Sequence, residues 1–288
     1  MDAMESRKIR PGVLAGGWYP ADPEGLRLSI EAHLVQGEGR AANSHGKISG
    51  IVLPHAGHKY SGRTCAAGIR RLRKSPGSTA ILLGPSHRAF VRGAVLSSAT
   101  HFETPLGAVL VNTSITKKLA AAGIPFSDSA HEKEHCLEIL LPFFQVAMTS
   151  VQIVPVLIGT LSESEHRRLA GQLLPVRDDG TILVASSDFV HYGAEFNYTP
   201  DVGADVRAGV RKIDMEAIEI IRSMDARALL EFRKKTGATI CGLTPIAVLM
   251  DALPKNSRVE LVDYSQSADV SGDTDHMVSY AAVAFYDS

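Results

Sequence analysis

Short apolar runs that end in glycine, proline or a polar residue recur along the chain and predict buried strands. Three of them cover residues 50–53, 79–83 and 181–185, with the length of strands that are buried on both faces. The first run stops at Pro54, because proline lacks the N–H that the next rung of a ladder needs. The other runs that predict strands are residues 93–98, 108–111, 151–158, 258–264 and 277–286.

Helical spacing of apolar residues fills most of the intervals between these strands. One such helix is expected from Pro23 to Gln36, with Asp22 placed to cap its start. The other predicted helices cover residues 63–73, 114–122, 132–145, 162–174, 205–224, 226–235 and 243–253. Residues 1–22 are expected to form an irregular N-terminal arm. Strands that alternate with helices indicate a single α/β domain over residues 1–288, with a central mixed, mostly parallel sheet flanked by helices.

Charge and hydropathy exclude several classes of protein. The net charge of −1 gives no sign of an extended nucleic-acid surface. No window reaches the roughly 18 uninterrupted apolar residues that a membrane span requires. The polar start of the chain lacks the apolar segment of a signal peptide. We therefore expect a cytoplasmic protein with neither a nucleic-acid nor a membrane partner.

Three histidines occupy equivalent places in the predicted sheet. His55, His87 and His191 each follow an apolar strand, so they converge if the strands are neighbours. One such histidine alone is usually a hydrogen-bonded structural residue. Three at the same edge suggest a metal site, because neutral imidazole suits iron, copper, zinc or nickel.

The three cysteines, Cys65, Cys136 and Cys241, are too widely spaced for a disulfide framework or a zinc ribbon. Cys65 and Cys136 fall inside predicted helices and are expected in the core. Cys241 lies in a glycine-flanked loop that opens a helix, where the helix N-terminus is expected to lower the pKa of the thiol. A structural role and a role as metal ligand or nucleophile both remain open for Cys241.

Further polar and aromatic residues have more than one interpretation each. Asp188 follows a strand three residues before His191, so it can cap a helix, orient His191 or bind a metal. His135 and Glu138 lie at i and i+3 on one face of the predicted helix 132–145, as an acid/base pair or as a solvated surface pair. Trp18, the only tryptophan, is either a core anchor for the arm or an aromatic wall of a cleft.

Six short motifs occur in an order that resembles the Memo family, the mediator of ErbB2-driven cell motility and its prokaryotic relatives. The resemblance runs from about Trp18 to the C-terminus. The motifs are Gly17-Trp18-Tyr19-Pro20, Pro54-His55-Ala56-Gly57, Gly84-Pro85-Ser86-His87, Glu134-His135-Cys136-Leu137-Glu138, Ser186-Ser187-Asp188-Phe189-Val190-His191-Tyr192-Gly193 and Thr239-Ile240-Cys241-Gly242.

The resemblance implies a fold shared with class III extradiol dioxygenases, which use non-heme Fe(II). It places His55, His87 and Cys241 as metal-site residues, with Asp188 and His191 beside them in one cleft. Those dioxygenases use two histidines and a glutamate, whereas the Memo pattern has the cysteine as third ligand. Fe(II) is the expected metal, with copper or zinc as alternatives because a thiolate is softer than a carboxylate.

The resulting hypothesis is a metal-dependent oxidoreductase with a small-molecule substrate. The metal would bind the substrate and O₂, and His191, held by Asp188, would act as general base. His135 and Glu138 would supply further contacts. Dioxygenase activity does not follow from the fold alone.

Two other functions stay open: a peptide- or partner-binding protein that uses the same cleft without catalysis, and a metallohydrolase. A hydrolase is less favoured because a thiolate ligand lowers the Lewis acidity of the metal. Prokaryotic members of the family are associated with a radical-SAM protein, which makes such a protein an expected partner. Two residues depart from the family pattern. Cys136 replaces a serine, and His58 is expected as a solvated loop side chain, or else as a group that binds metal or titrates near neutrality.

Overall fold

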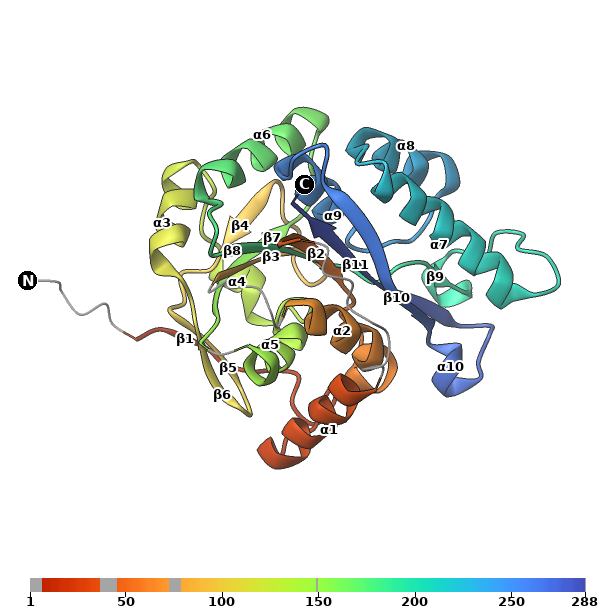
Figure 1. The fold of residues 1–288 in the computed structure, drawn as a ribbon, viewed down its shortest axis with the longest axis horizontal. Helices are drawn as coiled ribbons and strands as arrows, with labels where there is room; N and C mark the ends of the chain where they lie inside the picture. Colours follow the sequence, from red (N-terminus) through yellow and green to blue (C-terminus); the bar gives the residue numbers. More distant parts are fainter. Residues whose placement is uncertain (1–6, 37–45, 73–78, 149, 288) are drawn as a thin grey trace, which may run out of the picture.

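The computed structural model describes residues 7–36, 46–72, 79–148 and 150–287. Its centre is a mixed sheet of eight strands (Figure 1). β2, β8, β3 and β7 run parallel, whereas β10, β11 and β4 join them through antiparallel pairs. The predicted mixed, mostly parallel sheet is therefore confirmed. In spatial order the strands are β10 (Arg258–Gln266), β11 (Met277–Tyr286), β2 (Ile48–Leu53), β8 (Thr181–Ser186), β3 (Thr79–Pro85), β7 (Gln152–Ile158) and β4 (Ala94–Leu96), while β9 (His191–Tyr192) pairs with β11 off this path.

Helices cover both faces of the sheet, as expected when the strands are apolar on both sides. Within β2, Val52 packs into one buried cluster, whereas Ile51 and Leu53 pack into the other. The first cluster is completed by α3 (Thr113–Ala121), α6 (Glu163–Leu173), α7 (Val206–Arg222), α8 (Ala226–Thr236) and α9 (Leu243–Ala252). The second is completed by α1 (Pro23–Val35), α2 (His58–Leu72) and α5 (Leu141–Ala147). Among the described residues, no helix is long and apolar enough to cross a membrane.

The predicted helix 132–145 is wrong. The chain forms α4 (Asp128–Glu132), then a non-helical stretch, then the 3-10 turn η1 (Glu138–Leu140) and α5. The side chain of Glu134 accepts hydrogen bonds from the backbone N–H groups of His135 and Cys136, which holds the stretch outside a helix. Pro142 lies in the first turn of α5, where no intrahelical N–H is needed.

The N-terminal arm is irregular as expected, apart from the short β1 (Ile9–Arg10), which pairs with β5 (His101–Thr104) next to β6 (Gly107–Leu110). Residues 1–6 lie outside the described part. The arm is fastened by Glu138, whose side chain is fully buried. That carboxylate pairs with Arg10, accepts the N–H groups of Val13 and Leu14, and accepts the Tyr19 hydroxyl at 2.6 Å.

Candidate metal centre

Three neighbouring parallel strands deliver one side chain each to the same edge of the sheet. His55, His87 and Asp188 each come two residues after the end of their strand, β2, β3 and β8 respectively. Since carboxyl ends of parallel strands share an edge, these side chains converge, as the sequence predicted.

Cys241 reaches the same edge from the loop that precedes α9. The loop comes very close to the end of β8, because a Cβ at Gly242 would lie only 2.4 Å from the carbonyl oxygen of Ser186. Glycine is the residue that permits this approach. Cys241 lines a second cavity, of about 430 Å³, together with Ser86 and Arg233.

His55, His87 and Cys241 have the spacing of a metal-ligand set. One ligand atom from each lies within 4.8 Å of the others, and Cys241 Sγ is 3.2 Å from His55 Nε2. A metal ion with usual bonds of about 2.0–2.1 Å to nitrogen and about 2.3 Å to sulfur holds such atoms roughly 3–4 Å apart. The donor set therefore fits a transition-metal ion.

Hydrogen bonds fix the tautomer of His55. Its Nδ1 lies 2.9 Å from Ser186 Oγ, and that hydroxyl donates its own proton to the carbonyl oxygen of Cys136 at 2.6 Å. The serine oxygen must therefore accept from Nδ1–H, which leaves a lone pair on Nε2, the atom that faces Cys241. Burial, followed by the nearby His87, lowers the pKa of His55 well below its ordinary value, so the imidazole stays neutral.

The orientation of His87 depends on Glu134, a residue to which the sequence reasoning gave no role. Glu134 Oε1 accepts His87 Nδ1–H at 3.0 Å, and Oε2 accepts the backbone N–H groups of His87 and Arg88. Nε2 is therefore the nitrogen of His87 that keeps a lone pair for a ligand. Burial raises the pKa of Glu134, but hydrogen bonds from His135 and His87 outweigh it and hold the pKa well below its usual range.

Glu134, His87 and His135 form a second group whose ligand atoms lie within 4.8 Å of one another. The Glu134 oxygens already accept the N–H groups of His87, Arg88, His135 and Cys136. A metal bound there would displace these hydrogen bonds. The geometry therefore favours Glu134 as the group that orients His87.

Asp188 does not hold His191, contrary to the expectation from their spacing. Its carboxylate instead accepts the backbone N–H of His55 at 2.7 Å, and its own N–H points to Cys241 Sγ at 3.2 Å. His191 is oriented by two carbonyl oxygens, those of Phe189 and Thr239, which lie 3.0 and 3.1 Å from Nδ1. Nδ1 is therefore the protonated nitrogen, and Nε2 keeps a lone pair.

Burial shifts the acid–base properties of these groups. It raises the pKa of Asp188 to about 7 and lowers that of His191, which is therefore neutral at pH 7. Burial also raises the pKa of the Cys241 thiol, with Asp188 as the next cause, so the expected lowering by the helix N-terminus is wrong. A cation beside the sulfur would be needed to hold it as a thiolate.

The expected pair of His135 and Glu138 is also wrong. His135 faces the cleft, with its ring centroid 4.7 Å from Trp18 and 4.5 Å from His87. Glu138 points away from the cleft, into the anchor of the N-terminal arm, because no helix spans residues 132–145. Trp18 lines the cleft and also packs against the second buried cluster, so both of its interpretations hold.

The two departures from the family pattern are both buried. His58 begins α2 with Nε2 2.9 Å from the carbonyl oxygen of Ile139, so it is not a solvated loop side chain. Burial lowers the pKa of His58 to about 4, well below neutrality. Cys136 is in the core as expected, although not in a helix, and its Sγ donates to the carbonyl oxygen of Pro85.

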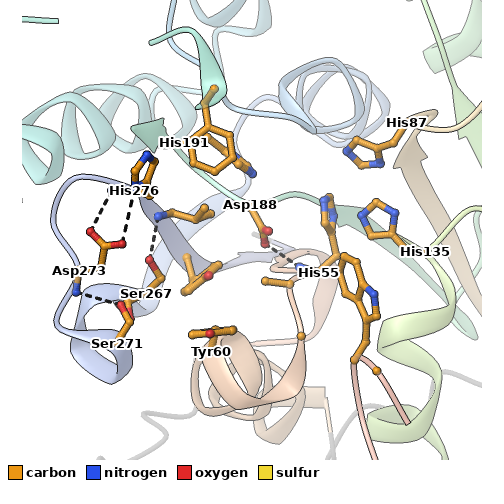
Figure 2. Close-up of a pocket in the computed structure, with 17 residues that line it drawn as sticks. His55, Tyr60, His87, His135, Asp188, His191, Ser267, Ser271, Asp273 and His276 are labelled. Carbon is orange, nitrogen blue, oxygen red and sulfur yellow. Dashed lines mark hydrogen bonds and ion pairs between the residues drawn. The ribbon is translucent and has the colours of Figure 1, made fainter. Parts of the chain in front are cut away.

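Two of the candidate ligands, His55 and His87, open into one pocket of about 600 Å³ (Figure 2). Its polar end holds His55, His87, His135, Asp188 and His191, and Trp18 closes one side. The pocket continues past Tyr60 to the segment after β10, which contributes Ser267, Ser271, Asp273 and His276. A small molecule that enters the pocket therefore meets the imidazoles at one end.

A family model described as "Memo-like protein" matches residues 10–284. The chain belongs to the Memo family. Protein MEMO1 of Homo sapiens is 32% identical over 300 residues, which cover 98% of this chain and 99% of that protein. A MEMO1 family protein of Archaeoglobus fulgidus is 33% identical over 281 residues, which cover 96% of this chain and 99% of that protein.

A solved structure shows that the Memo chain shares its fold more widely. The uncharacterized protein from Escherichia coli K12 has a TM-score of 0.50 and 12% sequence identity, and the match covers 83% of this chain and 99% of that one. At this identity the likeness concerns the fold alone.

Proposed function

We propose that this Memo-family chain binds one transition-metal ion through His55, His87 and Cys241 and uses it as a redox enzyme on a small molecule in the pocket. The observation that supports this most strongly is the approach of Cys241 Sγ to His55 Nε2 at 3.2 Å, with His87 within 4.8 Å of both. The tautomers of both histidines are set by hydrogen bonds that leave Nε2 free. Fe(II) is the expected ion, and copper or zinc are alternatives.

Three protein ligands leave room for further ligands, which the adjoining pocket can supply. A bound iron or copper ion would supply one-electron chemistry and a site for O₂. The protein supplies the proton transfer. His191 Nε2 takes a proton from a substrate group, while Nδ1–H stays bonded to the carbonyl oxygens of Phe189 and Thr239, which stabilise the imidazolium that forms.

Metal content tests the first part of the proposal. Wild type and Cys241→Ala are purified anaerobically and measured by plasma mass spectrometry. Cys65→Ala is the matched control, because Cys65 is another thiol but lies buried in α2. We expect near-stoichiometric iron or copper in wild type and the control, and none in Cys241→Ala. An absence of metal from wild type even after reconstitution would defeat the proposal.

The role of His191 is tested separately. His191→Ala should retain the metal and abolish substrate-dependent O₂ uptake, because the base is removed and the ligands stay. Loss of metal from this variant would instead make His191 a ligand.

A binding role without catalysis is the second candidate, favoured by the extension of the pocket beyond the imidazoles to Asp273 and His276. A ligand-binding protein keeps its affinity after chelation, whereas an oxidase loses all O₂ uptake. Measuring both on the same chelated sample distinguishes the two functions.

A further inference from the structure

The two ends of the pocket differ in chemistry. Figure 2 shows His55, His87 and His135 on one side of the pocket and Asp273 and His276 on the other. A ligand that fills the pocket must therefore suit both ends. The imidazole end accepts a group that binds a metal, so the open question is what the ligand carries at the Asp273 end.

Fixed positive charge is missing from the pocket wall. Within the described part of the chain, the lining contains two carboxylates, Asp188 and Asp273, and no lysine or arginine. Lys59 lies outside the lining, with Nζ 5.5 Å from the ring centroid of Tyr60. Phosphate and carboxylate ligands are usually held by such cations, so nothing at the Asp273 end favours an anionic group.

The two carboxylate oxygens of Asp273 differ in how firmly they are held. Oδ1 accepts the backbone N–H groups of Asp275 and His276 at 2.8 and 3.2 Å. These bonds lower the pKa of Asp273 and keep it charged at neutral pH. Oδ2 lies 3.7 Å from His276 Nδ1, an ion-pair contact longer than a hydrogen bond, and the side chain is 47% exposed, so this oxygen can also accept from a ligand.

The neighbouring polar groups leave this end negative. His276 lies between Asp273 and Glu195, with Nε2 4.0 Å from Glu195 Oε1, so two carboxylates flank one imidazole in either of its charge states. The hydroxyls of Ser267 and Ser271 already accept backbone N–H groups.

Four aromatic side chains line the pocket. Trp18 lies beside His135 and Phe196 lies beside His191, while Tyr60 and Tyr280 complete the set. Aromatic rings attract organic cations through their negative faces and pack against apolar carbon. We propose that the ligand of this pocket is an organic amine, whose ammonium group lies at Asp273 and whose opposite end lies at His55 and His87. This proposal rests on the proposed function only for the metal-binding end.

Three probes of nearly equal shape test the charge preference. Phenethylamine, 3-phenylpropanamide and 3-phenylpropionate are titrated by calorimetry into protein dialysed against EDTA, because a metal at the other end would attract the carboxylate. Work near pH 8, about 1.5 units above the ordinary pKa of histidine, keeps exposed imidazoles neutral. We expect the amine to bind roughly tenfold more tightly than the carboxylate, with the amide between them.

Equal or tighter binding of 3-phenylpropionate would overturn the proposal, and so would failure of phenethylamine to bind at up to roughly 10 mM, the weak range expected of so small a ligand.

Asp273→Asn should remove the preference, since asparagine keeps the acceptor for the turn and loses the charge. Asp201→Asn is the matched control. Its carboxylate also accepts a backbone N–H in a turn, that of Gly203 at 3.0 Å, and it lies outside the pocket lining. A preference that survives Asp273→Asn contradicts the proposal.

Metal content of the same samples before dialysis separates the two proposals. If only the metal-site proposal is wrong, the samples contain no metal and the protein still prefers the amine. If only the amine proposal is wrong, the protein shows no preference for the amine over the carboxylate and the samples contain metal.

Discussion

The candidate metal centre and the anchor of the N-terminal arm use similar residues in opposite ways. Both bury carboxylates next to cationic or imidazole groups. At the anchor, the Glu138 oxygens are consumed by Arg10, two backbone N–H groups and the Tyr19 hydroxyl. At the candidate centre, hydrogen bonds engage Nδ1 of both His55 and His87, and Nε2 of His55 contacts only the Cys241 thiol, at 3.2 Å, among the contacts described here.

The two clusters differ in how many of their polar atoms remain available after the hydrogen bonds within the protein have formed. A saturated cluster stabilises a fold, because any removal leaves buried groups without partners. A half-saturated cluster fixes the direction of its free atoms and leaves them available to a ligand. Residue type alone does not separate these cases, since a Glu-His-x-x-Glu motif supplies both Glu134 and Glu138.

The largest expected effect is at the anchor. Glu138→Ala leaves Arg10 charged and buried and removes the acceptor of three further donors, so it should lower the free energy of unfolding by about 3–5 kcal/mol. Urea denaturation measures this. Glu138→Gln, which keeps part of the hydrogen bonding, should cost less. A loss below about 1 kcal/mol would contradict the role of a saturated anchor.

The second-largest expected effect is a pH dependence of stability caused by Asp214. This residue of α7 is fully buried. It accepts the N–H of Val190 and the Tyr264 hydroxyl, and burial raises its pKa to about 6. A raised carboxyl pKa favours the folded state below the unfolded pKa near 4, and that contribution disappears as pH rises through 6. Asp214→Asn does not titrate, so it should gain about 3 kcal/mol relative to wild type between pH 4 and 7.

Unfolding curves of both proteins across this pH range measure the change. A difference between them that is independent of pH would show that Asp214 does not titrate between its unfolded and folded values. The variant should keep His191 in place, because asparagine can still accept the N–H of Val190.

The smallest expected effect is a loss of metal affinity at the candidate metal centre. Glu134→Gln removes the charge that holds His87 and places an amide donor against backbone N–H groups, so metal should bind about 10–100-fold more weakly. Competition with a chelator, using cobalt as a coloured probe, measures the affinity. Glu138→Gln is the control, since it changes an equally buried carboxylate outside the pocket. Equal losses in both variants would mean that the effect reports general stability.

The apolar runs predicted that His55, His87 and His191 lie at one edge of the sheet, and all three line the same pocket. Cys241 follows no apolar strand, so only the resemblance to the Memo family placed it beside them. Hydrogen-bond partners could not be predicted in the same way. The spacing of Asp188 and His191 suggested a pair, but the chain turns so that carbonyl oxygens hold His191 and Asp188 turns to His55.

Glu138 was assigned to the cleft because helical spacing was assumed across residues 132–145. The local hydrogen bonds of Glu134 override that spacing, and nothing in the apolar pattern records them. Glu134 itself stands beside His135 in the motif, but its contact with His87 joins distant parts of the chain and has no local signal.

The position of β11 has a consequence for biosynthesis. β2, which carries His55, lies between β8 and β11, and both of those neighbours come much later in the chain. A ribosome that has produced β2, β3 and the turns after them has therefore made two of the three candidate ligands, His55 and His87, long before the sheet around them can close. Until Cys241 and β11 have emerged, these imidazoles are exposed to any metal in the cell. Loading of the proposed metal site would therefore depend on timing as well as on affinity.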